Sequence, residues 1–243
     1  MRGVVLAGVG GNQRNQSQPA RGALTPRDIE LLRYVTRHGV CTGEQVGGRF
    51  FAGSTATWRR LRILEQLGLI CRRRTWWQRP RVILATAVGA QLASADLPPA
   101  RINLPELEHA LAVVDLSEQL LKENHGSRWV TERELRRDAI RSHRAAGMEP
   151  RPGRVRTADG VLVVGERRIA VELDLTNKRT EVYEQLLRAY AGARGVDAVW
   201  WFGRSAPMRE RLAAIARRYE LADFVKVREW SAPLRGPDLE LGA

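Results

Sequence analysis

The sequence is poor in cysteine and in long apolar runs. Its two cysteines, Cys41 and Cys71, belong to no Cys-x-x-Cys pair, and the four histidines do not cluster near them. The sequence therefore argues against a zinc site and predicts two reduced thiols in a cytoplasmic protein. No segment approaches the roughly 18 continuous apolar residues of a membrane span. The apolar stretch at the start of the chain is short and glycine-rich, so we expect no signal peptide.

Lysine is also scarce. Only Lys122, Lys178 and Lys226 are lysines, and all the other residues among the 40 basic ones are arginine. Arginine forms planar, bidentate pairs with phosphate, whereas lysine is a compact point charge. A coding bias toward arginine would produce the same skew. In either case the position of each lysine is informative.

The positive charge is concentrated in the first part of the chain. The net charge is +13, and residues 1–104 carry 16 basic against 5 acidic side chains, while the remainder is nearly balanced. Concentrated positive charge attracts a polyanion, and DNA or RNA is the obvious one. Of these, double-stranded DNA is the partner that we expect. A basic surface that only keeps the protein soluble is the alternative.

The pattern of residues 24–95 predicts three helices followed by a β-hairpin. We expect helices at 25–38, 42–50 and 54–68, the first capped by Thr25 and the third by Ser54. Strands are expected at 69–74 and 81–84, and a last helix follows at 86–94.

This order is that of a winged helix-turn-helix domain, in which the third helix enters the major groove and the hairpin lies against the backbone or minor groove. Trp76 and Trp77 at the hairpin tip would stack on DNA, bury at a dimer contact or pack against the second domain. For the arginines, the alternative is a solvated charged face. The candidate DNA-binding residues are Arg59, Arg60, Arg62, Arg72, Arg73, Arg74, Arg79, Arg81, Trp76 and Trp77.

The rest of the chain predicts a second domain at 105–231, joined by a proline-containing linker at 96–104. The chain ends, 1–23 and 232–243, are expected to be tails. We expect a helix at 105–124, a strand at 128–135 and a long basic loop at 136–154. Two hairpin strands follow at 161–164 and 169–173. The last expected elements are a helix at 177–193, a strand at 198–202, a helix at 207–219 and a strand at 224–227.

Three carboxylates gather on the predicted hairpin of the second domain. Glu172 and Asp174 are two residues apart and share one strand face, and Asp159 begins the neighbouring strand. Carboxylates that converge in this way can hold Mg²⁺ or Mn²⁺, which can activate water for phosphodiester cleavage. Thr176 is expected to cap the next helix, so that Lys178 in its first turn reaches back to the carboxylates. A plain surface hairpin explains the same residues without a metal.

The order of elements in the second domain, with Asp159 and Glu172 on adjacent strands, resembles the PD-(D/E)xK nuclease superfamily. The two-domain layout resembles more closely the replication-relaxation family of plasmid and phage replication and transfer genes. That family looks like a winged helix followed by a restriction-endonuclease-like mixed sheet flanked by helices, an α+β architecture. The likeness covers residues 25–230 and rests on four segments: Glu108–Leu116, Thr131–Leu135, residues 158–160 and Val171–Lys178.

The resemblance implies that Asp159 and Glu172 are metal ligands. The lysine that the pattern places two residues after Glu172 is Asp174 here, and Lys178 is the candidate to take over its role. A further carboxylate would come from Glu118, or from Glu132 and Glu134. His109 matches the family's helix and is expected to be a packed or capping residue near the site.

Two functions follow from these observations. The first is a DNA-processing protein of a mobile element that nicks DNA with Mg²⁺ or Mn²⁺, using Asp159, Glu172, Asp174 and Lys178. The second is a non-catalytic DNA-binding regulator or accessory factor with an inactive nuclease fold, which the Asp174 replacement favours. Further partners would be a second copy of the chain or replication and transfer proteins.

Overall fold

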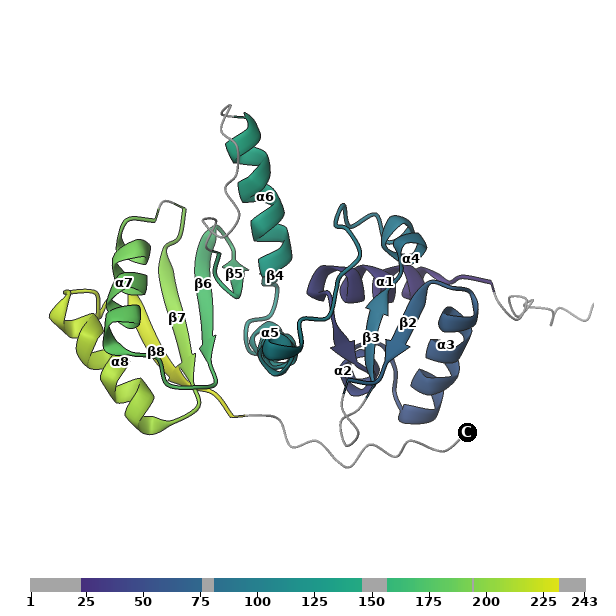
Figure 1. Cartoon of the computed structure of the whole chain (residues 1–243), viewed down its shortest axis with the longest axis horizontal. Helices are drawn as coiled ribbons and strands as arrows, with labels where there is room; N and C mark the ends of the chain where they lie inside the picture. The colour runs from purple at the N-terminus through teal and green to yellow at the C-terminus, as the bar shows by residue number, and fades with distance from the viewer. Residues whose placement is uncertain (1–22, 76–80, 146–156, 194, 232–243) are drawn as a thin grey trace, which may run out of the picture.

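The computed structural model describes residues 23–75, 81–145, 157–193 and 195–231, and shows an α+β protein, as predicted (Figure 1). An N-terminal unit, residues 23–94, contains a small sheet with helices around it. A C-terminal unit, residues 104–231, contains a five-stranded sheet. The predicted tails and the hairpin tip, with Trp76, Trp77 and Arg79, lie outside the described residues. None of the helices described is long and apolar enough to cross a bilayer.

The N-terminal unit has the predicted helices and hairpin, with one additional short strand. The added strand, β1, pairs with β3 and places Cys41 opposite Ile83. Its sheet order is β1-β3-β2, entirely antiparallel. The elements are α1 (Pro26–His38), β1 (Cys41–Thr42), α2 (Gly43–Phe50), α3 (Ser54–Gln66), β2 (Ile70–Arg73), β3 (Val82–Ala85) and α4 (Ala87–Leu92).

Local capping explains where the first two helices begin. Thr25 and Asp28 form a reciprocal capping box at α1, and Thr42 and Gln45 form another at α2. The helix α1 ends at Gly39, whose φ of 85° favours glycine. The prediction that Ser54 caps α3 was wrong, since Gly53 is the N-cap and no side chain caps this helix.

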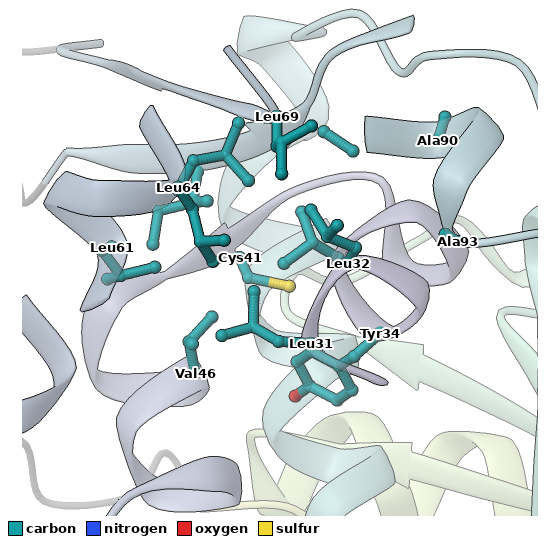
Figure 2. Packing of buried hydrophobic residues seen from close by; sticks show 14 of the residues in the cluster. Leu31, Leu32, Tyr34, Cys41, Val46, Leu61, Leu64, Leu69, Ala90 and Ala93 are labelled. Carbon is teal, nitrogen blue, oxygen red and sulfur yellow. The ribbon is translucent and has the colours of Figure 1, made fainter. Parts of the chain in front are cut away.

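The core of the N-terminal unit is formed where α1, α2 and α3 meet the sheet (Figure 2). Leu31 and Leu32 of α1 and Leu61 and Leu64 of α3 are fully buried there. Val114 of the C-terminal unit belongs to the same cluster. The core is therefore continuous across the boundary between the two units.

The C-terminal sheet has the order β4-β5-β6-β7-β8. The pairs β4–β5 and β5–β6 are antiparallel, whereas β6–β7 and β7–β8 are parallel. Helices α7 and α8 cover one face, and α5 covers the other and lies between the sheet and the N-terminal unit (Figure 1). The elements are α5 (Leu107–Glu123), β4 (Arg128–Thr131), α6 (Glu132–Ala145), β5 (Gly160–Val164), β6 (Arg167–Asp174), α7 (Thr180–Ala191), β7 (Ala198–Gly203), α8 (Ala206–Arg218) and β8 (Val225–Glu229).

Two sequence predictions for this unit were wrong. Residues 132–145 form helix α6 in place of the end of a strand and most of a loop. The cause is a capping pair, since the backbone N–H and hydroxyl of Thr131 both donate to Glu134 and start the helix. In addition, Thr176 caps no helix, because α7 begins four residues later, at Thr180 after Arg179. Lys178 therefore precedes the helix.

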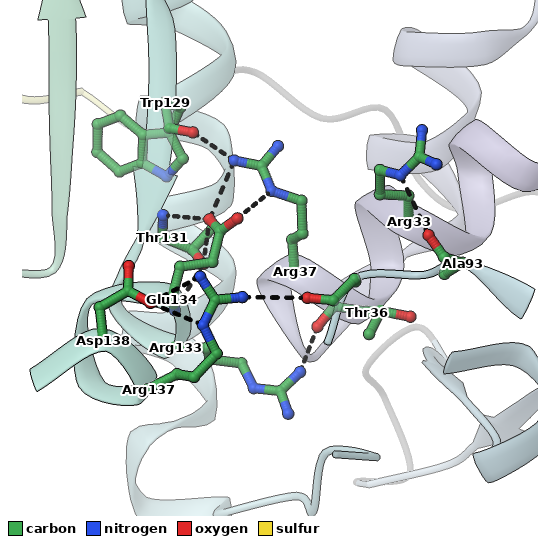
Figure 3. Close-up of polar contacts among 11 residues, drawn as sticks. Arg33, Thr36, Arg37, Ala93, Trp129, Thr131, Arg133, Glu134, Arg137 and Asp138 are labelled. Carbon is green, nitrogen blue, oxygen red and sulfur yellow. Dashed lines mark hydrogen bonds and ion pairs between the residues drawn. The ribbon is translucent and has the colours of Figure 1, made fainter. Parts of the chain in front are cut away.

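Charged side chains of α1 and α6 join the two units (Figure 3). Arg37 of α1 donates to both carboxylate oxygens of Glu134, at 2.8 and 3.0 Å, and to the carbonyl of Trp129. In return, Arg133 of α6 donates to the carbonyls of Thr36 and Pro98. Burial alone would raise the pKa of Glu134, but the hydrogen bonds from Arg37 and Thr131 hold it below its ordinary value.

We predict that the Arg37–Glu134 pair stabilises the whole chain. Arg37→Ala should lower the free energy of unfolding by about 1–3 kcal/mol, because it leaves a largely buried carboxylate without its main donor. Urea denaturation measures this change. The control is Arg141→Ala, which breaks the exposed pair with Asp96 and should cost less than about 1 kcal/mol. Equal effects of the two substitutions would contradict the prediction.

Candidate nucleic-acid interface and carboxylate cluster

The arginines of α3 fall into two groups. Arg59 and Arg62 are exposed, three residues apart, and neither makes an ion pair with a residue in the described part of the chain. Arg60 lies on another side of the helix and donates to the carboxylate of Asp28, with Nε to Oδ1 at 2.6 Å. Asp28 is only 1% exposed. Arg60 therefore holds the α1 capping box in place.

The hairpin arginines are divided in a similar way. Arg72 donates to Glu65 of α3 through its side chain at 2.7 Å and its backbone N–H at 3.1 Å. This contact ties β2 to α3. Burial would raise the pKa of Glu65, and the hydrogen bonds from Arg72 hold it below its ordinary value. Arg73 and Arg74 are exposed at the end of β2, and Arg81 is half-buried just before β3.

In the C-terminal unit, Asp159 contacts His109, which the sequence predicts only as a packed or capping residue near the site. The Nε2 atom of His109, in the first turn of α5, lies 3.0 Å from Oδ1 of Asp159. The other oxygen, Oδ2, accepts a hydrogen bond of 2.8 Å from the backbone N–H of Leu173. The pair is partly exposed, with side-chain exposures of 36% for His109 and 18% for Asp159.

Electrostatics favour a charged His109–Asp159 pair. Burial alone would lower the pKa of His109, but the hydrogen bond and charge of Asp159 raise it above its ordinary value. Glu132, at the start of α6, lies close enough to Asp159 and His109 for their charges to change its pKa. Burial raises the pKa of Glu132, and Asp159 raises it further against the opposing effect of Arg136.

The other two predicted ligands lie at the end of β6 and are nearly fully buried. Glu172 is 4% exposed and accepts a hydrogen bond from the hydroxyl of Tyr190. Asp174 is 2% exposed, and its Oδ2 accepts a 2.9 Å bond from the indole of Trp201. Lys178 does reach back to this carboxylate, as predicted, and pairs with Oδ1 of Asp174.

Each of the three carboxylates thus has its own protein donor. Within the described residues, no group of three or more His, Cys, Asp or Glu side chains is arranged to hold a metal ion. Asp159 contacts His109, Glu172 contacts Tyr190, and Asp174 contacts Lys178 and Trp201. A divalent ion needs several free oxygen ligands, so these residues do not fit Mg²⁺ or Mn²⁺ unless their present donors are displaced. Glu118 pairs with Arg49 and Glu134 with Arg37.

Comparison with protein families decides the affiliation of the chain. The sequence model of one family, described as replication-relaxation, matches residues 32–201, which is more than two thirds of the chain and includes parts of both units. The chain belongs to the replication-relaxation family. Membership of the replication-relaxation family indicates a role in the replication or relaxation of plasmid or other mobile-element DNA. No curated protein and no solved structure matches the chain.

The His109–Asp159 pair gives a testable pH dependence. Asp159→Asn should lower the pKa of His109, because the opposing charge is lost while the burial remains. NMR titration of the imidazole protons measures this pKa. Since the folded pKa is raised, the pair should stabilise the fold below the ordinary histidine pKa of about 6.5 and lose that contribution as pH rises through the folded value. An unchanged pKa in Asp159→Asn would rule out the ion pair.

Proposed function

We propose that this protein binds duplex DNA through its N-terminal unit, used as a winged helix, during replication or relaxation of mobile-element DNA. In this proposal α3 enters the major groove and the hairpin arginines lie along the backbone. The observation that carries it is the pair Arg59 and Arg62, which are exposed on one side of α3 without an ion pair among the described residues. Arginines in this position are free to bind phosphates or guanine edges.

The division of the arginines supports the proposal further. Arg60 and Arg72 are already engaged by Asp28 and Glu65. These internal pairs fix the orientation of α3 against α1 and β2, so that the exposed arginines are presented on a rigid support. Rigid presentation lowers the entropy that binding must overcome. Arg73 extends the exposed positive charge to the end of β2.

For the C-terminal unit, we propose a non-catalytic role in binding or assembly. This is supported by the internal donors of Asp159, Glu172 and Asp174 and by the near-complete burial of the last two. The alternative is a nickase, in which Mg²⁺ or Mn²⁺ would supply Lewis acidity and activated water. That alternative requires the hydrogen bonds of these carboxylates to open when DNA or metal binds.

The double variant Arg59→Ala/Arg62→Ala should weaken duplex binding at least fivefold, since a good bidentate arginine contact is worth about 1–3 kcal/mol. Its salt dependence should also become shallower, by about 0.9 in log–log slope for each phosphate that the variant no longer binds. Fluorescence anisotropy on a labelled duplex at several salt concentrations measures both.

Arg60→Ala is the matched control. It should lower stability by about 3 kcal/mol or more, because Asp28 would be left buried without its charged partner and with only the hydrogen bonds from Thr25. The duplex affinity of its folded fraction should fall less than that of the double variant, because Arg60 orients α3 through Asp28 and does not itself bind the DNA. If the double variant binds like wild type, α3 does not bind DNA in the proposed way. The same conclusion holds if Arg60→Ala, under conditions where it is fully folded, weakens duplex binding as strongly as the double variant does.

A further inference from the structure

The α5 side of the C-terminal sheet is not uniformly covered. Helix α5 packs mainly on β4, β5 and β6. Ala198 and Phe202 of β7 are buried in the same cluster as α5, whereas Trp200 of β7 and the neighbouring strand β8 carry side chains that are not fully buried. Side chains alternate along each strand. In the register of the sheet, Trp200 pairs with Val171 of β6 and with Lys226 of β8, and Phe202 pairs with Arg228. The side chains of each pair lie on the same face of the sheet. A row of aromatic and basic residues therefore lies on this face beside α5.

Two cation–aromatic contacts organise this surface. The guanidinium carbon of Arg228 lies 3.6 Å from the centre of the Trp200 ring, which is direct stacking distance. The guanidinium carbon of Arg204 lies 5.9 Å from the ring of Trp230, which is 4% exposed. We call these residues the Trp200 patch: Trp200, Arg204, Lys226, Arg228 and Trp230.

The charges of the Trp200 patch are only weakly neutralised. Among the described residues, Arg204 pairs with Glu108 at 4.0 Å and Lys226 lies 3.8 Å from Asp223. All four side chains are at least half exposed. Exposed pairs at such distances contribute little. Arg228 makes no ion pair with any residue in the described ranges. The patch therefore keeps positive charge available beside flat ring and guanidinium surfaces.

We propose that the Trp200 patch binds a single-stranded nucleic acid. The Trp200 ring holds the guanidinium of Arg228 as a flat platform on which a base can stack, as bases do on aromatic rings and arginine planes. Lys226 and Arg204 flank the platform and bind the phosphates on either side. The proposal concerns the opposite unit from α3 and does not depend on duplex binding there. It complements the proposed function, since replication and relaxation both expose single strands.

The test uses the full chain and two fluorescein-labelled strands of about 12 nucleotides, within the usual range for single-strand sites. One strand is oligo(dT), and the other has the same phosphates but no bases. Arg228→Lys keeps the charge and removes the plane. It should weaken oligo(dT) binding at least about fivefold and leave the abasic strand within about twofold. Lys226→Ala should weaken both strands and reduce the salt slope by about 0.7.

Arg217→Ala removes an exposed arginine from α8, which covers the other face of the sheet, and should leave the binding of both strands unaffected. Arg59→Ala/Arg62→Ala should weaken duplex binding without changing oligo(dT) binding. The proposal for α3 and the proposal for the Trp200 patch can therefore fail independently of each other. Thermal denaturation verifies that each variant is folded. Wild-type affinity of Arg228→Lys and Lys226→Ala for both strands would overturn the proposal. Competition by poly-glutamate as effective as that by oligo(dT) would also overturn it, because the patch would then recognise any acidic chain.

Discussion

The ion pair between Arg37 and Glu134 determines how the two halves of this protein are placed. Arg37 lies in the last turn of α1, which supports α3, and Glu134 lies in the first turn of α6, so one contact fixes a helix of each unit. The fully buried Val114 adds an apolar side chain of α5 to the N-terminal core. The surface of α3 is therefore carried in a fixed orientation relative to the C-terminal sheet. DNA bound by the first unit would reach the second unit at a defined position.

Most of the fold could be predicted from the sequence because its signals are local. Threonine and proline at the start of α1 and glycine after it determine the two ends of that helix. The apolar spacing of α3 determines that helix in the same local way. Helix α6 was missed because the Thr131–Glu134 capping pair lies inside a segment with the alternation of a strand. The short strand β1 was missed because its pairing with β3 depends on contacts distant in sequence.

The candidate sites were less predictable, since a pattern gives residue types but not their partners. The exposed Arg59 and the engaged Arg60 are neighbours with identical side chains, and only Asp28, thirty-two positions from Arg60, distinguishes them. His109 was expected near the site, but its contact with Asp159 joins residues fifty positions apart in the sequence and was not predicted. Lys178 was correctly expected to reach the carboxylates, although from a loop and not from a helix. Burial of Glu172 and Asp174 is a tertiary property.

We infer that this protein binds DNA while the carboxylates of its C-terminal unit are committed to internal partners. The most direct measurement is a supercoiled plasmid assay with Mg²⁺ and then Mn²⁺, in which retarded migration and nicking are followed on the same gel. We expect retarded plasmid that stays supercoiled after the protein is removed, for wild type and for Asp159→Ala and Glu172→Ala alike. Relaxed or linear product from wild type that both substitutions abolish would contradict this claim and establish a metal-dependent nuclease.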